Sequence, residues 1–184
     1  MYIEETYGWL AEHCKGWQFG EQGVLKALCE RKGITNGIEI GAGDGTTLPV
    51  TLGFLPNLTL YEIQENRQEK LRKLYPKAAV KGEYKGEDLP DHSCVVVDVD
   101  SFDYDIAEKV TSYGKPAIMM VEHYDLEGPG VQDAMVPDWL IGLSLANHFR
   151  IQQPFAVVRG LMESRGYQLV AVTRVNGIYV YEEE

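Results

Sequence analysis

Short apolar runs alternate with amphipathic segments along most of the chain. The apolar runs predict five strands: Gly37–Ile40, Leu58–Ile63, Ala78–Lys81, Cys94–Asp100 and Ala117–Val121. Apolar residues at helical spacing predict helices from Glu21 to Lys32, Gln64 to Tyr75, Tyr104 to Tyr113 and Phe155 to Arg165, and a glycine or a proline follows each of them. A short helix or lead-in is expected from Ile3 to Lys15, and a short helix from Thr46 to Gly53.

The order of these segments predicts the sheet. Strands that alternate with helices form a parallel sheet covered on both faces, and the unbroken run Cys94–Asp100 suits a central strand. The chain closes with a predicted hairpin, Tyr167–Arg174 and Gly177–Tyr181, around the tight-turn pair Asn176-Gly177. We therefore expect an α/β fold with a doubly wound, Rossmann-like, seven-stranded sheet, mostly parallel with one antiparallel strand from the C-terminal hairpin.

A single domain is expected over residues 1–184, because this length buries a sizeable core. A helical lead-in occupies residues 1–36 of the predicted domain. The stretch from about 124 to 154 contains Gly128-Pro129-Gly130 and Pro137, and we interpret it as a cap-like insertion because connections of this length are usually functional.

Composition and charge narrow the choice of partners. Hydrophobic residues make up 45% and charged residues 24% of the chain, as in ordinary globular proteins. The formal net charge of −11 opposes binding to a phosphate backbone, so no nucleic acid is expected. The three cysteines show no C-x-x-C spacing, the N-terminus has no signal-peptide pattern, and no apolar run approaches the length of a membrane span. We expect a cytoplasmic protein with no membrane partner.

The most informative stretch is Gly37–Thr47, with the sequence GIEIGAGDGTT. Its apolar run ends in three glycines at alternate positions, Gly41, Gly43 and Gly45, which tolerate positive φ and let a ligand approach the backbone. The next strand ends in Glu62, and an acid at that place can bind the two hydroxyls of a ribose. Together they predict a nucleoside-cofactor site. A nicotinamide dinucleotide is the alternative ligand, although its fingerprint, G-x-G-x-x-G, has a different spacing.

The order of segments and the motif Glu39–Thr46 resemble the class I methyltransferases that use S-adenosylmethionine (SAM), whose sheet also ends in a hairpin. The motif looks like that family's first motif, E/D-x-G-x-G-x-G. The resemblance implies that the Gly turn lies against the amino-acid end of SAM, that Glu62 holds the ribose and that Ile63 flanks the adenine. The cofactor-binding residues that it implies are Glu39, Gly41, Ala42, Gly43, Asp44, Thr46, Glu62, Ile63, Glu83 and Asp98.

A narrower resemblance is to the FkbM-like methyltransferases. It rests on the lead-in Glu21–Leu25, the segment Val97–Tyr104 and the fifth strand preceded by Lys115-Pro116. The chain departs from the usual pattern at Ser101, which replaces a glycine, and at His123, where relatives often carry tyrosine or asparagine. These departures leave the class of methyl acceptor open.

Acids and one histidine follow the fourth and fifth strands, at the edge where open α/β sheets bind ligands. Asp98, Asp100, Glu122 and His123 are the predicted catalytic residues, with one of them taking the proton of an acceptor hydroxyl as general base. The same four residues form an alternative site for Mg²⁺ or Mn²⁺, since oxygen ligands and an imidazole suit both metals. Their spacing is similar to that of metal-dependent catechol-type O-methyltransferases. Asp103 is expected to cap the helix that begins at Tyr104.

These residues and resemblances predict a SAM-dependent methyltransferase that acts on a hydroxyl of a small-molecule or sugar-like acceptor, with the cap-like insertion covering that acceptor. Two other classes of function stay open. One is a nicotinamide-dependent oxidoreductase of Rossmann fold, which NADH rather than SAM would stabilise. The other is a protein that binds SAM or a nucleotide without catalysing a reaction.

Overall fold

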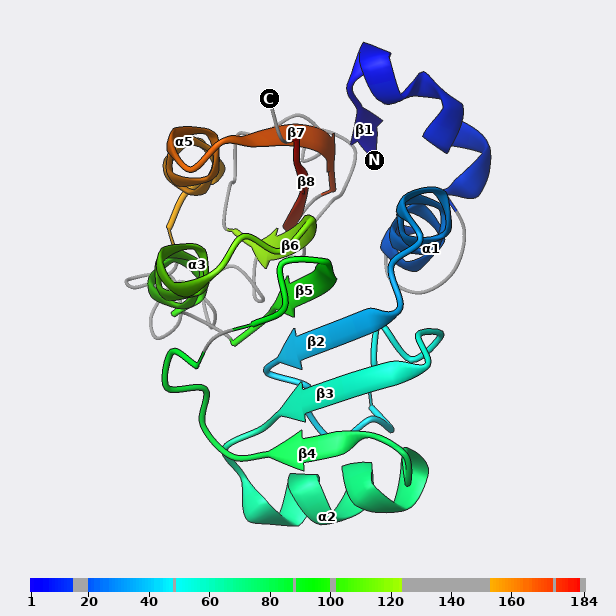
Figure 1. The fold of residues 1–184 in the computed structure, drawn as a ribbon, viewed down its shortest axis with the longest axis vertical. Helices are drawn as coiled ribbons and strands as arrows, with labels where there is room; N and C mark the ends of the chain where they lie inside the picture. Colours follow the sequence, from blue (N-terminus) through cyan, green and yellow to red (C-terminus); the bar gives the residue numbers. More distant parts are fainter. Residues whose placement is uncertain are drawn as a thin grey trace, which may run out of the picture.

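The computed structural model describes residues 1–14, 20–47, 49–87, 89–99, 102–123, 153–173 and 175–182. These residues form one eight-stranded sheet in the order β1-β7-β8-β6-β5-β2-β3-β4 (Figure 1). Its strands are β1 (Tyr2–Ile3), β2 (Asn36–Ile40), β3 (Asn57–Tyr61), β4 (Ala79–Lys81), β5 (Ser93–Val97), β6 (Ile118–Glu122), β7 (Tyr167–Val172) and β8 (Asn176–Tyr181). The helices are the 3-10 helix η1 (Glu5–His13) and the α-helices α1 (Glu21–Lys32), α2 (Glu65–Leu74), α3 (Asp103–Tyr113) and α5 (Phe155–Ser164).

The sheet is mostly parallel, which confirms the predicted fold class. The ladders β4-β3, β3-β2, β2-β5 and β5-β6 are parallel, and β8 lies antiparallel between β6 and β7 as the predicted hairpin requires. The predicted turn pair is wrong, because Asn176 and Gly177 are the first two residues of β8 and pair with its neighbouring strands. The predicted number of strands is one too few, because Tyr2–Ile3 adds an edge strand antiparallel to β7. A strand of two residues is too short to show an alternating pattern, so the sequence indicated only a helix or lead-in at that place.

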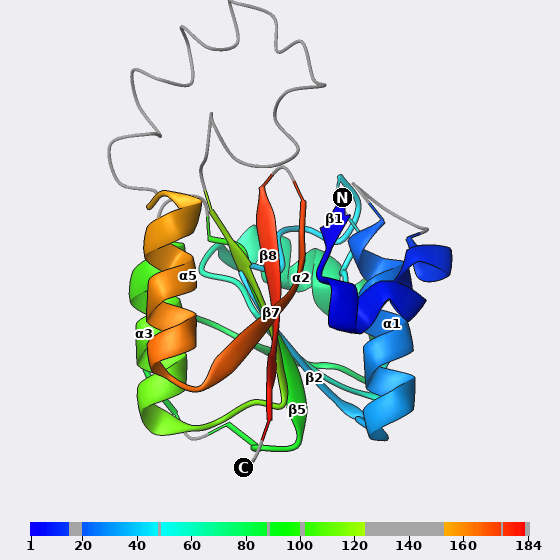
Figure 2. The same cartoon turned by 90° about the horizontal axis from the view of Figure 1, so that it is seen from above.

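Helices cover both faces of the sheet, which makes three layers (Figure 2). On one face the apolar side chains of α1 and α2 pack against a core cluster that includes Leu60 and Val96. On the other face α3 and α5 pack against a second cluster that includes Val95 and Tyr179. All five residues of β5 are buried between the two layers, as expected of the central strand. None of the described helices is long and apolar enough to cross a membrane.

One predicted helix is wrong. The described residues between Thr46 and Gly53 form turns and bends rather than a helix. Carboxylates of the preceding segment, from Glu39 and Asp44, accept hydrogen bonds from backbone amides of this stretch. The bonds to Glu39 take the place of the carbonyl acceptors four residues earlier that a helix would offer to the amides of Thr51 and Leu52, so the segment is held as a loop.

Candidate functional site

The carboxyl ends of β2, β3 and β5 meet at one edge of the sheet, and the predicted site residues follow them directly. Ile40, at the end of β2, lies in register with Tyr61 of β3 on one side and with Val97 of β5 on the other. The Gly turn, Glu62 and Asp98 therefore begin at the same level. The amides of Gly41 and Ala42 both donate to the carbonyl of Tyr61, at 2.9 and 3.0 Å, which fixes the turn against the residue that precedes Glu62.

The glycines of the turn have different roles. Gly41 has φ of 91°, and a Cβ placed on it would lie 1.7 Å from the carbonyl oxygen of Asp98. The absence of a Cβ at Gly41 thus allows the ends of β2 and β5 to pack closely together. Gly43 has φ of 61°, and a Cβ there would meet nothing within 4 Å, so this part of the turn faces open space. Of these two positions, Gly43 is the one at which a ligand has room to approach the backbone.

Glu39 points into the protein and organises the loop behind the turn. Its side chain is only 6% exposed, and its two carboxylate oxygens accept the amides of Thr51 and Leu52 at 3.2 and 3.1 Å. Burial raises the pKa of Glu39 to about 7, the two amide bonds oppose this shift, and the charge of Asp98 adds to it. Glu39 was expected to bind the cofactor. Its two bonds place it beneath the loop, where it orders the backbone from inside.

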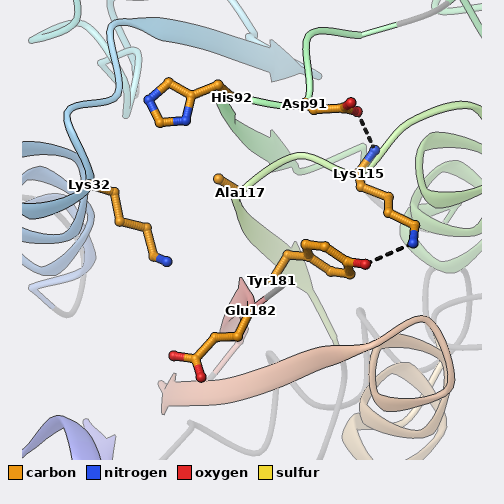
Figure 3. A pocket seen from close by; sticks show the side chains of 7 residues that line it. All are labelled: Lys32, Asp91, His92, Lys115, Ala117, Tyr181 and Glu182. Carbon is orange, nitrogen blue, oxygen red and sulfur yellow. Dashed lines mark hydrogen bonds between the residues drawn. The ribbon is translucent and has the colours of Figure 1, made fainter. Parts of the chain in front are cut away.

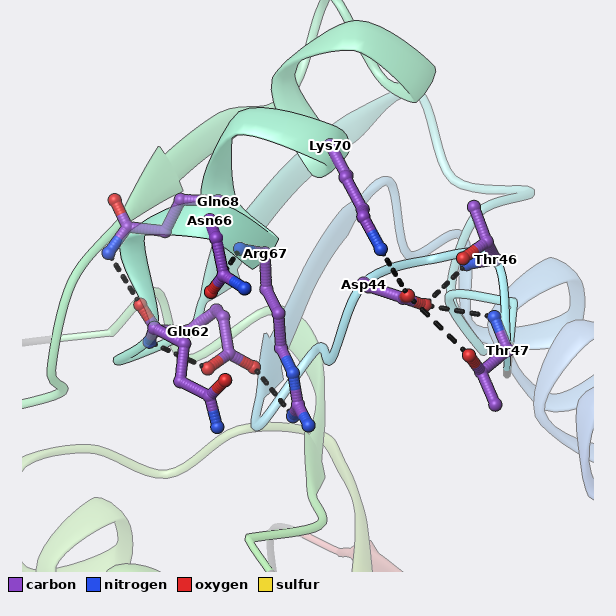
Figure 4. Close-up of polar contacts among 9 residues, drawn as sticks. Asp44, Thr46, Thr47, Glu62, Asn66, Arg67, Gln68 and Lys70 are labelled. Atoms are coloured by element: carbon purple, nitrogen blue, oxygen red, sulfur yellow. Dashed lines mark hydrogen bonds and ion pairs between the residues drawn. The ribbon is translucent and has the colours of Figure 1, made fainter.

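Asp44 holds the turn from the outer side. One carboxylate oxygen accepts the amides of Thr46 and Thr47, both at 2.9 Å, and the other accepts the ammonium of Lys70 from α2 at 3.0 Å (Figure 4). These bonds hold the pKa of Asp44 well below its usual range, with the two amides as the largest cause. The side chain of Asp44 thus cross-links the Gly turn to α2.

Glu62 is buried directly after β3. Its Oε1 accepts the amide of Gln64 at 2.8 Å, and its Oε2 lies 3.8 Å from Nη1 of Arg67 in the first turn of α2 (Figure 4). Gln68 also donates its side-chain amide to the backbone carbonyl of Glu62 at 2.8 Å. The neighbouring Ile63 is 74% exposed, so a large apolar side chain stands at the surface next to this acid. Exposed apolar surface beside a predicted nucleoside site is suited to covering a base.

Glu83 lies in the loop after β4 and is exposed. Its neighbour Tyr84 is buried, packs edge-on against Tyr61 with ring centroids 5.3 Å apart, and donates its hydroxyl to the carbonyl of Glu87. The loop is therefore anchored through Tyr84, and it carries Glu83 on the outside of that anchor.

The acids at the carboxyl ends of β5 and β6 are placed by the register of the two strands. Val97 pairs with Val121, so Asp98 and Glu122 follow on adjacent strands, and both are partly buried. His123 is only 2% exposed, its ring centroid lies 4.8 Å from that of Phe155, and its amide donates to the carbonyl of Val175. His123 is thus more deeply buried than Asp98 and Glu122, although Oε2 of Glu122 is itself buried.

The remaining predictions for this edge divide into three outcomes. Asp103 does not cap α3, since Phe102 is the N-cap residue; its buried carboxylate accepts the amide of Val99 at 2.8 Å instead. Asp100 and the cap-like insertion at 124–152 lie outside the described residues. Among the residues that are described, no three His, Cys, Asp or Glu side chains group as metal ligands, and without Asp100 the proposed Mg²⁺ or Mn²⁺ set stays a prediction.

Sequence reasoning missed three side chains that shape this region. Arg67 and Lys70 looked like ordinary charged residues of an amphipathic helix, and only the fold brings them to Glu62 and Asp44. Glu21 was part of a motif, but its carboxylate is buried and accepts hydrogen bonds from Thr173 and Asn176 at 2.6 and 2.8 Å. Those partners lie 152 and 155 residues after Glu21 in the sequence, so no local sequence pattern indicates the contact.

A hollow with a volume of about 610 Å³ lies at the opposite end of the parallel strands (Figure 3). It is bounded by Lys32, Lys115, Asp91 and Glu182 among others, so its formal charges balance. Lys115 donates its ammonium to the Tyr181 hydroxyl at 2.7 Å. The balanced charges favour no class of ligand, and the lining includes none of the predicted site residues.

No protein-family profile and no curated protein matches the chain. Solved structures do match. The methyltransferase domain of bacterial CtHen1 is 10% identical, with a TM-score of 0.57 over 87% of this chain and 97% of that domain.

Two further matches have a bound ligand in the structure. Magnesium protoporphyrin IX methyltransferase from Synechocystis PCC 6803, with bound SAH, is 12% identical with a TM-score of 0.55 over 88% of this chain and 82% of that one. Human N-acetylserotonin methyltransferase, in complex with SAM, is 11% identical with a TM-score of 0.56 over 89% of this chain. The chain spans 55% of the length of the human protein. At these identities the likeness shows that the chain has the Rossmann-like fold of these methyltransferases.

Proposed function

We propose that this protein binds SAM at the carboxyl edge of β2, β3 and β5 and transfers its methyl group to a hydroxyl of a small molecule or sugar-like acceptor. The observation that carries the proposal is the bond of the Gly41 and Ala42 amides to the carbonyl of Tyr61. It joins the Gly turn rigidly to the residue before Glu62. The two predicted contact points for a nucleoside cofactor, the turn and the acid, thus form one preorganised unit.

Each part of SAM has a matching feature at this edge. The open side of the turn at Gly43 receives the amino-acid end of SAM, and the carboxylate of Glu62 accepts the ribose hydroxyls. The exposed side chain of Ile63 covers one face of the adenine. Glu39 and Asp44 hold the loop in shape through backbone amides on its two sides. The chain thereby fixes the donor before the acceptor arrives.

Methyl transfer needs little activation of the donor, because a sulfonium is already a good leaving group. In the proposed reaction the acceptor oxygen attacks the methyl carbon, the bond from that carbon to sulfur breaks, and the hydroxyl proton passes to a base. Asp98 and Glu122 are the partly buried carboxylates proposed for this step, and Asp100 and His123 complete the proposed catalytic set. Asp98 and Glu122 also suit Mg²⁺ or Mn²⁺, which would lower the pKa of a bound hydroxyl.

The proposal of an oxygen acceptor draws on the fold neighbours. A structure described as mitomycin 7-O-methyltransferase matches with a TM-score of 0.54 at 13% identity, and an O-methyltransferase family protein from Burkholderia thailandensis with 0.55 at 14%. The FkbM-like motifs agree with this choice, since they supply the acids at the carboxyl ends of β5 and β6.

Calorimetric titration of the purified protein with SAM, with NADH as the competing ligand, tests the proposal. We expect SAM to bind and NADH to leave no signal. Binding of NADH alone would overturn the proposal in favour of an oxidoreductase. Transfer of labelled methyl from SAM to a panel of small hydroxyl compounds, with and without chelator, then distinguishes an enzyme from a protein that only binds SAM and shows whether a metal takes part.

A further inference from the structure

Helix α2 pairs a cation with each of the two acids that follow β2 and β3. Lys70 bonds Asp44 of the Gly turn at 3.0 Å, and Arg67, three residues earlier, lies 3.8 Å from Glu62 (Figure 4). Residues three apart lie on the same face of a helix, so both cations point from α2 toward the site. The two pairs nevertheless stand in different positions relative to the proposed ligand.

The Asp44–Lys70 pair stabilises the Gly turn without blocking the side of the turn that a ligand would approach. Asp44 Oδ1 is occupied by the amides of Thr46 and Thr47, and Lys70 holds the second oxygen from outside. No ligand group needs to replace these bonds, because the open side of the turn is at Gly43. Lys70 is therefore expected to help binding by keeping the turn in shape.

The Glu62–Arg67 pair, in contrast, blocks access to the carboxylate of Glu62. Glu62 is only 5% exposed, so a ribose has almost no surface of its carboxylate to touch. One oxygen is bonded to the backbone amide of Gln64, which cannot leave without unfolding the start of α2. Arg67 stands at the other oxygen on a side chain that is 43% exposed, and it can swing into water at little cost.

We propose that Arg67 is a latch on the cofactor acid: its guanidinium occupies the place at Glu62 Oε2 that a ribose hydroxyl takes, and the nucleoside must displace it to bind. The latch rests on the proposed SAM site. It compensates the negative charge of Glu62 while the site is empty, and it sets the affinity for the nucleoside part of the cofactor below the value that Glu62 alone would give.

The test compares Arg67→Met with Lys70→Met by calorimetric titration. Arg67→Met keeps the apolar stem and removes the competing charge, so we expect it to bind SAM about two- to fivefold more tightly, the factor that corresponds to a partly exposed ion pair. Lys70→Met is expected to bind SAM more weakly. Lys73→Met, an equal loss of charge at an exposed position of the same helix, is the control and is expected to bind as the wild type does.

A second ligand separates the two effects. 5′-Methylthioadenosine has the ribose and adenine of SAM but lacks its amino-acid end. We expect Arg67→Met to bind this ligand more tightly as well, and we expect Lys70→Met to bind it as the wild type does. Arg67→Lys restores a cation at the same place and is expected to return the affinity toward the wild-type value.

Two results overturn the latch in different ways. In the first, the wild type binds SAM, and Arg67→Met binds both SAM and 5′-methylthioadenosine no more tightly than the wild type does. Arg67 would then support Glu62, and the latch would be refuted while the SAM site stands. If neither the wild type nor any variant binds SAM, the proposed function itself fails and the latch fails with it. Thermal unfolding of each variant checks that the fold is retained.

Discussion

The buried carboxylate of Glu39 makes the stability of this protein depend on pH, and Glu39→Gln tests the reason. Glu39 accepts two backbone amides inside the protein and is 6% exposed. Glutamine has nearly the same shape and never ionises. Its oxygen can accept one of the two amides, but its NH₂ group faces the other, which leaves one buried amide without an acceptor at a cost of about 1–3 kcal/mol at every pH.

The pH-dependent part follows from the pKa of Glu39, which burial raises from 4.5 to about 7. Between these two values the folded protein holds a proton that the unfolded chain has lost, so stability falls as the pH rises through this window. Each pKa unit corresponds to about 1.4 kcal/mol, and the wild type therefore loses roughly 3 kcal/mol of its free energy of unfolding between pH 4.5 and pH 8 through this one group.

The assay is urea unfolding of wild type and Glu39→Gln at pH 5 and at pH 8.5. Titrating groups that do not interact with Glu39 contribute equally to both proteins and cancel in the difference. At pH 5 the wild type is expected to have the larger free energy of unfolding. We expect this difference from Glu39→Gln to shrink by roughly 3 kcal/mol at pH 8.5, where it approaches zero or changes sign. Glu69→Gln makes the same chemical change at an exposed position of α2 and is the control.

A difference between wild type and Glu39→Gln that stays constant from pH 5 to pH 8.5 would refute this reasoning. It would mean that Glu39 ionises in the folded protein as easily as in the unfolded chain. The two amide bonds would then outweigh the burial of the charge.

Three further substitutions test other parts of the site. Ile63→Ala should leave the free energy of unfolding within about 0.5 kcal/mol, because the side chain is 74% exposed, yet weaken SAM binding by about fivefold in calorimetry; unchanged affinity would remove Ile63 from the adenine contact. Gly41→Ala should prevent folding or lower the free energy of unfolding by more than about 3 kcal/mol, since its Cβ would lie 1.7 Å from the Asp98 carbonyl oxygen. Gly43→Ala should lower it by only about 1 kcal/mol and reduce SAM affinity. Equal melting temperatures for the two variants would contradict the packing role of Gly41. Glu21→Ala should lower the free energy of unfolding by about 1–3 kcal/mol in urea, because two buried donors lose their acceptor, and a smaller loss would show that water replaces it.

Periodicity along the chain was enough to predict most of the fold. The apolar runs at β2, β3, β5 and β6 are local features, and the parallel, doubly wound sheet follows from their alternation with helices. The closing hairpin was predicted too, but its turn was misplaced, because Asn176 and Gly177 belong to β8. The alternate glycines also predicted a turn with positive φ, which Gly41, Gly43 and Gly45 all adopt. Each of these inferences uses residues that are close together in the sequence.

Errors arose where a side chain meets a backbone group that the local pattern does not reveal. The described residues from Thr46 to Gly53 do not form the predicted helix because Glu39 binds the amides of Thr51 and Leu52. Asp103 bonds backward to Val99 rather than capping its own helix. Propensity cannot foresee such competition, since the carboxylate must first be brought into place by the sheet.

The residues of the candidate site thus divide by the range of their interactions. The sequence was enough to predict the Gly turn and the acid after β3 as site residues, because nucleoside binding favours those residue types at those strand ends. The tertiary structure alone places Arg67 on Glu62, Lys70 on Asp44 and the carbonyl of Asp98 against Gly41. The physical reason is that these contacts depend on how α2 and β5 lie beside the turn. That arrangement comes from packing of the whole sheet, and no spacing within a single segment encodes it.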